Sequence, residues 1–111
     1  MLEEAPFDAQ AAEYELWYQT PQGRYADTLE KDLFLRLVRP KLGQSVLDVG
    51  CGTGHNLAFF KELGLKATGI DISKPMLDIA AKKLGSEVEL HWGHAEELPF
   101  DNDSFDIVTL I

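Results

Sequence analysis

The apolar positions of this chain follow a helical period near the N-terminus and then change to short continuous runs. Leu29, Leu33 and Leu37 recur every fourth residue, which places them on one face of a predicted amphipathic helix. Asp27 has the chemistry of an N-cap for this helix, and the Pro and Gly residues at positions 40 and 43 end it. Just before it, residues 20–23 have the composition of a turn.

After position 43 the pattern predicts alternating strands and helices. Four short apolar runs, rich in β-branched residues, predict buried strands at residues 45–49, 67–72, 88–92 and 105–111. Helices fit between the first three strands, one with Leu57, Phe60 and Leu63 inward, and one that begins after Ser73 and ends at Gly85. Strands that alternate with helices predict an α/β fold with a parallel sheet.

The last predicted strand has the composition of a central strand, yet no helix or polar tail follows it. A central strand left at an open edge would expose unpaired backbone groups. We therefore expect residues 1–111 to be the first half of a longer protein. The alternative is an edge strand that pairs with a second copy of the chain.

The composition is that of a soluble globular protein, with 45% hydrophobic and 26% charged residues. One cysteine excludes a disulfide framework. No apolar run reaches the ~18–20 residues of a membrane span, and the acidic N-terminus lacks the features of a signal peptide. These features predict a reducing, cytoplasmic setting. The net charge is −9, and residues 84–111 hold seven acidic residues and no basic one, which argues against nucleic acid as a partner.

The densest candidate chemistry lies in the loop after the first predicted strand, where Asp48 to Gly54 read Asp-x-Gly-x-Gly-x-Gly. Glycines let a ligand approach the main chain, and the helix that follows offers free backbone N–H groups at its start. The loop is not the dinucleotide pattern Gly-x-Gly-x-x-Gly, because His55 replaces the third glycine, and no Gly-Lys-Ser/Thr follows as in a P-loop. The Asp48 carboxylate would repel a pyrophosphate and would suit a ligand with an ammonium or sulfonium charge.

A second carboxylate, Asp71, ends the next predicted strand, 23 residues after Asp48. An acidic residue at this place in a nucleotide-binding sheet accepts hydrogen bonds from ribose hydroxyls. Ile72 beside it offers an apolar face to an adenine ring. On its own Asp71 is equally compatible with a helix cap, but together with the glycine loop it indicates a nucleoside-containing ligand.

Four segments in order resemble the motifs of class I S-adenosylmethionine-dependent methyltransferases: residues 46–54, 69–73, 93–100 and 103–108. Within this class the chain is most similar to the type 11 small-molecule group. The resemblance implies a Rossmann-like fold, a doubly wound parallel sheet with helices on both faces, of which this chain would hold the N-terminal half. It implies S-adenosyl-L-methionine as the cofactor and direct displacement of its methyl group onto a small molecule.

The resemblance also divides the chain and assigns a cofactor site. Residues 1–43 would form an N-terminal helical lid, and residues 44–111 the first half of the cofactor-binding domain. Gly50 and Gly52 would approach the methionine part of the cofactor, with Asp48 near its amino group. The full set of implied cofactor-binding residues is Asp48, Gly50, Cys51, Gly52, Asp71, Ile72, Met76, His94, Ala95 and Glu96.

On the adenine side, the resemblance places the ring between Ile72 and Met76, with a backbone N–H from Ala95. His94 is a departure, because the family often has Asp at this position. A neutral imidazole would still accept a hydrogen bond from the exocyclic amine, whereas a protonated one would not. The alternative is that His94 is simply exposed in a loop.

Three aromatic residues of the lid, Tyr14, Trp17 and Tyr18, would shield the positive sulfonium, or alternatively pack against the helix that follows. No catalytic residue is assigned, because the cofactor carries the reactivity in methyl transfer and the protein aligns the reactants. His55 is not assigned as a base, and no metal site is expected.

Two other functions stay open at this point. One is a non-catalytic module that binds the same cofactor. The other is an NAD-dependent oxidoreductase, which Asp48 and the missing third glycine disfavour. The sequence does not identify the methyl acceptor, the atom that is methylated or the oligomeric state.

Overall fold

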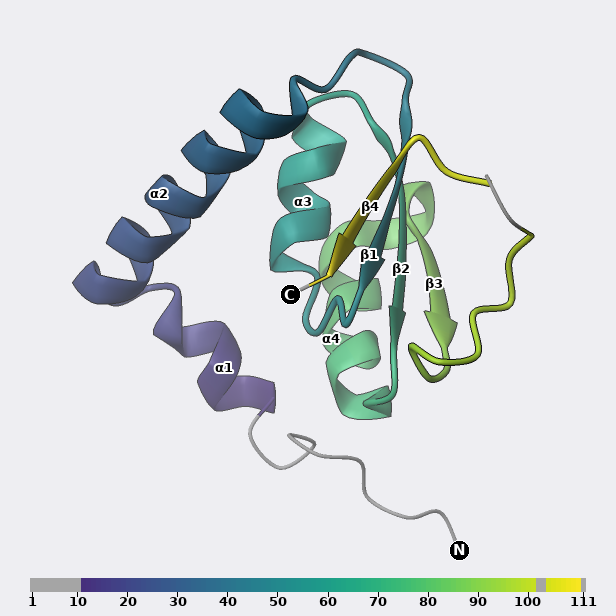
Figure 1. Ribbon diagram of the computed structural model, residues 1–111. Helices are drawn as coiled ribbons and strands as arrows, with labels where there is room; N and C mark the ends of the chain where they lie inside the picture. Colours follow the sequence, from purple (N-terminus) through teal and green to yellow (C-terminus); the bar gives the residue numbers. More distant parts are fainter. Residues whose placement is uncertain (1–10, 102–103, 111) are drawn as a thin grey trace, which may run out of the picture.

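The computed structural model describes residues 11–101 and 104–110, except for the side chains of residues 11, 12 and 14. Its four strands form one parallel sheet in the order β3-β2-β1-β4. The strands are β1 (Ser45–Val49), β2 (Lys66–Asp71), β3 (Glu89–Trp92) and β4 (Ile107–Leu110). All four arrows in Figure 1 point to the same edge of the sheet, so the loops that follow the strands gather there. The predicted parallel α/β architecture is confirmed.

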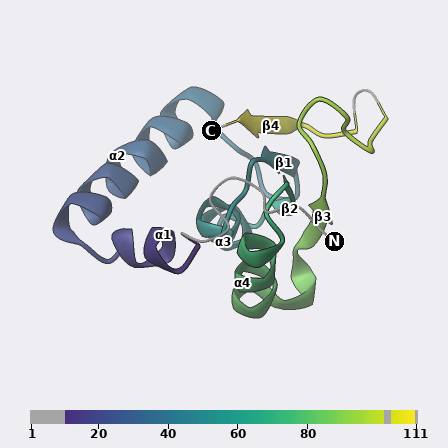
Figure 2. The ribbon, with the colours of Figure 1, turned by 90° about the horizontal axis from the view of Figure 1, so that it is seen from below.

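The helices of the described residues lie on one side of this sheet (Figure 2). They are α1 (Ala11–Trp17), α2 (Pro21–Val38), α3 (His55–Glu62) and α4 (Lys74–Leu84), with the short 3-10 helix η2 (Gly85–Glu87) after α4. Figure 2 shows them on one side of the strands and the loop between β3 and β4 on the other. On that second side, Phe100 and Phe105 of the loop pack against side chains of β1 and β2. The family resemblance implies helices on both faces of the sheet, and in the described residues they lie on one face. None of these helices has the length and apolar character to cross a membrane.

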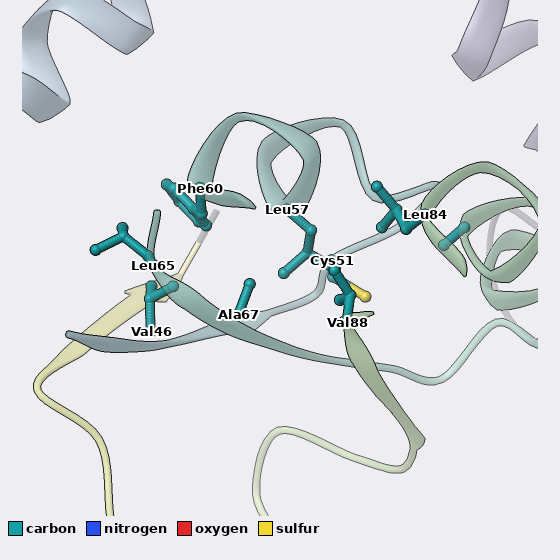
Figure 3. Packing of buried hydrophobic residues seen from close by; sticks show 9 residues of the cluster. Val46, Cys51, Leu57, Phe60, Leu65, Ala67, Leu84 and Val88 are labelled. Carbon is teal, nitrogen blue, oxygen red and sulfur yellow. The ribbon is translucent and has the colours of Figure 1, made fainter. Parts of the chain in front are cut away.

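The core lies between the sheet and helices α3 and α4 (Figure 3). Leu57 and Phe60 of α3 are buried, as predicted, and burying each such side chain contributes about 1.5–3 kcal/mol. Gly69 of β2 makes the close approach possible, because a Cβ there would lie 2.6 Å from Cδ1 of Leu57 and 2.8 Å from Sγ of Cys51. The buried cluster consists of Val46, Cys51, Leu57, Phe60, Leu65, Ala67, Ala80, Leu84 and Val88.

The start of α2 differs from the prediction. The helix begins at Pro21, and Thr20 is its N-cap, with the Thr20 hydroxyl accepting a hydrogen bond from the Gly23 N–H at 3.0 Å. Residues 20–23 are therefore the first turn of α2 and not a separate turn, and Asp27 lies inside the helix. A hydroxyl N-cap followed by Pro at the first helical position is a stronger start signal than an isolated Asp.

The apolar face predicted for α2 forms, but the described residues leave it uncovered. Leu33 and Leu37 are 56% and 74% exposed. Phe34 is the α2 residue that reaches the core, with its ring 4.9 Å from that of Phe60. An apolar groove of about 400 Å³ consequently runs between α2, α3 and the end of β4 at Leu110.

Candidate functional site

The loop between β1 and α3 is shaped by its glycines. Gly50, Gly52 and Gly54 have φ angles of 78°, 56° and 83°, in the left-handed region that favours glycine. The N–H groups of Gly50 and Cys51 both donate to the carbonyl of Ile70, at 2.8 Å and 3.1 Å. The loop therefore folds over the end of β2 and brings its main chain to the edge where the strands end.

Asp71 connects this loop to the next helix. Its Oδ2 atom accepts a hydrogen bond from the Gly52 N–H at 2.8 Å, and its Oδ1 atom accepts one from the Ser73 N–H at 2.8 Å. Ser73 in turn caps α4, as the sequence predicts, by accepting from the Met76 N–H. An ionised carboxylate offers about four acceptor positions, so Asp71 keeps acceptor capacity for a ligand.

An open cleft of about 280 Å³ lies at the ends of β1 and β2, beside the segment after β3. It brings together six residues that the sequence analysis assigned to the cofactor: Gly50, Asp71, Ile72, His94, Ala95 and Glu96. The same cleft has four further lining residues, which were not singled out: Val49, Ile70, Gly93 and Leu110. Val49 and Ile70 could have been assigned from the sequence, because side chains alternate between the two faces of a strand. Both residues point to the sheet face opposite the helices.

Asp48 does not line this cleft. It is 1% exposed and lies on the same sheet face as Val46, toward α3. The Thr109 hydroxyl of β4 donates to its Oδ1 atom at 2.7 Å. Burial raises the pKa of Asp48 to about 6, although this hydrogen bond lowers it, and the nearby Asp71 carboxylate adds to the rise. No local pattern predicts the role of Thr109, which is 61 residues away from Asp48 along the chain.

Cys51 and Met76 are also buried away from the cleft, at 6% and 5% exposure. The Cys51 sulfur packs within the core near Leu57. Burial raises the pKa of this thiol far above its usual range, and the carboxylates of Asp71 and Asp48 raise it further. The thiol is therefore inert as a nucleophile at neutral pH.

The N-terminal helices contact the glycine loop from the α3 and α4 side. Glu15 of α1 forms an ion pair with Lys83 of α4 at 2.7 Å. Burial raises the pKa of Glu15, but the Lys83 ammonium outweighs it and holds that pKa below its usual value. The Thr53 hydroxyl of the loop is buried and, within the described residues, has no hydrogen-bond partner.

Of the aromatic residues assigned to the lid, Tyr18 packs against the start of α3. The Tyr18 ring stacks on His55 with 3.6 Å between centroids, and Trp17 meets Tyr18 edge-on at 5.2 Å. Neither ring lines the cleft. The Tyr14 side chain lies outside the described residues.

Comparison with known protein families matches residues 46–111 to a family described as "Methyltransferase domain". This range begins in β1 and includes the glycine loop, Asp71 and the cleft.

Individual relatives agree with this match. The demethylmenaquinone methyltransferase of Clavibacter sepedonicus is 35% identical over 76% of this chain and 35% of its own length. The uncharacterized methyltransferase YcgJ of Bacillus subtilis is 33% identical over 98% of this chain and 43% of its own length. The crystal structure of YcgJ superposes with a TM-score of 0.64 and 34% identity over 72% of this chain and 36% of that one.

The [4+2]-cyclase SpnF is a further structural neighbour, with a TM-score of 0.67 and 32% identity over 78% of this chain and 34% of that one. The chain thus spans between a third and a half of the length of these proteins. Since the family match covers more than half of the chain and coincides with the glycine loop and Asp71, the chain belongs to the methyltransferase domain family, within the class I S-adenosylmethionine-dependent methyltransferases.

Proposed function

We propose that this chain is the cofactor-binding half of an S-adenosylmethionine-dependent methyltransferase that acts on a small molecule. Residues 44–111 would form the first half of the cofactor domain, and residues 1–43 a segment that covers it. The observation that carries the proposal is the cleft in which Asp71, Ile72 and the segment after β3 converge on the glycine loop.

The ribose fits Asp71. Both oxygens of this carboxylate hold one backbone N–H each, which fixes its orientation without filling its acceptor capacity. Its side chain stands at the wall of the cleft, within reach of a ligand. The two ribose hydroxyls would donate to these oxygens, as they do in other nucleotide-binding sheets.

The adenine ring fits the apolar part of the cleft. Ile70, Ile72 and Leu110 supply its walls, and the backbone of Ala95 offers an N–H group. Gly93 keeps the floor open, because a Cβ there would lie 3.1 Å from Cδ1 of Ile70. His94 lines the same cleft and in its neutral form would accept a hydrogen bond from the exocyclic amine.

The methionine part fits the glycine loop. Gly50 lines the cleft with no side chain, so a ligand reaches the main chain there. Asp48 lies behind the loop and favours the positive ammonium and sulfonium groups through its field. When bound, the cofactor supplies an electrophilic methyl group, and the chain's task is to hold the ligand in one orientation and to keep water away.

Calorimetric titration with S-adenosylhomocysteine tests this proposal, with NADH as the comparison ligand and circular dichroism as the check of folding. We expect saturable binding of S-adenosylhomocysteine and none of NADH. Asp71→Ala should weaken binding roughly tenfold or more, because it removes charge-assisted hydrogen bonds. Asp78→Ala, at an exposed position of α4, removes the same charge and should leave the affinity unchanged.

Two outcomes would contradict the proposal. Binding of NADH in place of S-adenosylhomocysteine would favour an oxidoreductase. Binding of S-adenosylhomocysteine by a full-length protein that methylates nothing would favour a non-catalytic module or another reaction. The neighbour named as a cyclase shows that likeness over this half does not by itself specify the reaction.

A menaquinone-like small molecule as acceptor is favoured by the relatives that are named demethylmenaquinone methyltransferases. The acceptor atom and the oligomeric state are open, and the cytoplasmic setting and the absence of a nucleic-acid partner stay predictions from the sequence.

A further inference from the structure

His55 is the first residue of α3 and follows the glycine loop directly. Its side chain is 22% exposed, and its Nε2 atom lies 2.6 Å from Oδ1 of Asp27 on α2. The Tyr18 ring stacks on the imidazole, with 3.6 Å between centroids and 10° between planes. One side chain beside the glycine loop therefore contacts both α2 and the joint that connects α1 to α2.

Charged groups from three helices surround this imidazole. Asp27 pairs through its other oxygen with Lys31 at 2.8 Å. Glu15 of α1 interacts electrostatically with His55 and is itself paired with Lys83 of α4 at 2.7 Å. Two carboxylates, those of Asp27 and Glu15, thus lie close to His55 at the start of α3.

The contact between His55 and Asp27 is a direct polar link between α2 and the residue that follows the glycine loop. The stacking of Tyr18 on His55 adds a second contact at the same place. The glycines on either side of Thr53 permit several backbone conformations, so contacts on this flank of the loop restrict it. The position of the N-terminal helices and the shape of the loop are therefore coupled.

We infer that His55 is a positioning residue: bound to Asp27 and stacked on Tyr18, it holds the N-terminal helices against the glycine loop and keeps that loop in its cofactor-binding shape. The inference rests on the proposed function, since it concerns the same site.

The test is titration of the whole chain with S-adenosylhomocysteine. Because Asp48 has a pKa of about 6, each variant is compared with the wild type at equal pH. We expect Asp27→Asn and His55→Gln to bind roughly two- to fivefold more weakly than the wild type, and the double variant to bind no more weakly than either, because both substitutions break the same contact. Asp32→Asn, on the exposed face of the same helix, is the matched control and should follow the wild type.

Hydrogen exchange without any ligand gives a second readout. We expect the amides of the glycine loop to exchange faster in Asp27→Asn than in Asp32→Asn at the same pH. Wild-type affinity and wild-type exchange in both Asp27→Asn and His55→Gln would overturn the inference and leave the proposed function intact. Absence of binding by the wild type at every pH would overturn the proposed function and this inference together.

Discussion

Asp48 is an acidic side chain in surroundings that disfavour its charge. It is fully buried, its one hydrogen bond within the described residues comes from Thr109, and its pKa is raised to about 6. The unfolded chain has an Asp pKa of ~3.9. Between these two values the folded chain keeps a proton that the unfolded chain releases, so the free energy of unfolding falls as the pH rises through this window.

In the wild type we therefore expect the free energy of unfolding to fall by on the order of 1 kcal/mol between about pH 5 and 7.5. In Asp48→Asn this fall should be absent. Asparagine retains the oxygen that accepts from Thr109 and carries no charge. Urea unfolding at the two pH values measures the difference. Asp78→Asn, at an exposed position, serves as the control and should keep the wild-type difference. If the free energy of unfolding falls equally in Asp48→Asn and in the wild type, ionisation of Asp48 does not destabilise the fold and the prediction is wrong.

Gly69 shows how closely α3 sits on the sheet. A methyl group there would overlap Leu57 and Cys51, at 2.6 Å and 2.8 Å. We expect Gly69→Ala to lower the free energy of unfolding by about 1–3 kcal/mol, as overpacking does in other cores. Gly93→Ala, whose new methyl group would meet the flexible end of Ile70 at 3.1 Å, should cost less. Equal stability losses in the two variants, measured by urea unfolding, would contradict this packing.

At the residue scale, the sequence predicts what is local and misses what is distant. The glycine loop and Asp71 follow from a short motif and a strand end, and the structure brings them together in one cleft. The bond from Thr109 to Asp48 joins residues 61 positions apart, and no spacing rule reaches that far. Asp48 and Asp71 lie on the same sheet face, because Asp48 pairs with Gly69, two residues before Asp71. Asp71 is the last residue of β2 and lines the cleft, whereas Asp48 lies one residue inside β1 and is buried.

The elements were predicted with different success. The strands and the two helices between them follow from a clear change of period, and β1 has the predicted bounds. The start of α2 was misplaced because two cap signals stand seven residues apart, at Thr20 and Asp27, and the apolar period begins only after the second one. Contact with α1, through the Trp17 carbonyl that accepts from the Thr20 hydroxyl at 2.7 Å, favours the first.

The joint between α1 and α2 depends on Gly23. A Cβ there would lie 2.1 Å from the Trp17 carbonyl oxygen, which is a backbone atom and cannot turn away. We expect Gly23→Ala to displace α1 from the glycine loop, with a stability loss of about 1–3 kcal/mol and weaker binding of S-adenosylhomocysteine. Gln22→Ala, one position earlier and exposed, is the control. Circular dichroism and titration measure the two effects, and wild-type behaviour of Gly23→Ala would contradict the described joint.

At the scale of the whole molecule, one face of the described structure is apolar and open. Leu33 and Leu37 of α2 and Leu110 of β4 border the groove of about 400 Å³ and are 56%, 74% and 76% exposed. Contiguous apolar surface of this kind promotes association in water. The parallel sheet and the helices between its first three strands followed from the sequence. Whether this apolar face is covered did not follow, because the pattern shows only that it is apolar.

We therefore expect this chain to associate as its concentration rises, and Leu37→Lys to weaken that association. Sedimentation velocity over a range of concentrations measures it. Leu42→Lys replaces a leucine that is 85% exposed and lies outside the groove, so it should associate as the wild type does. A wild-type chain that stays monomeric throughout would contradict this prediction.

We propose that the cleft beside the glycine loop binds the cofactor. Nitrogen-15 NMR of the labelled chain during titration with S-adenosylhomocysteine tests this, because each amide reports on its own surroundings. We expect the largest shifts at Gly50, Asp71, Gly93 and Ala95 of the cleft and at Gly52, whose N–H donates to Asp71, and only small shifts at the α2 residues that border the apolar groove. Large shifts confined to that groove, or none in a folded chain, would contradict it.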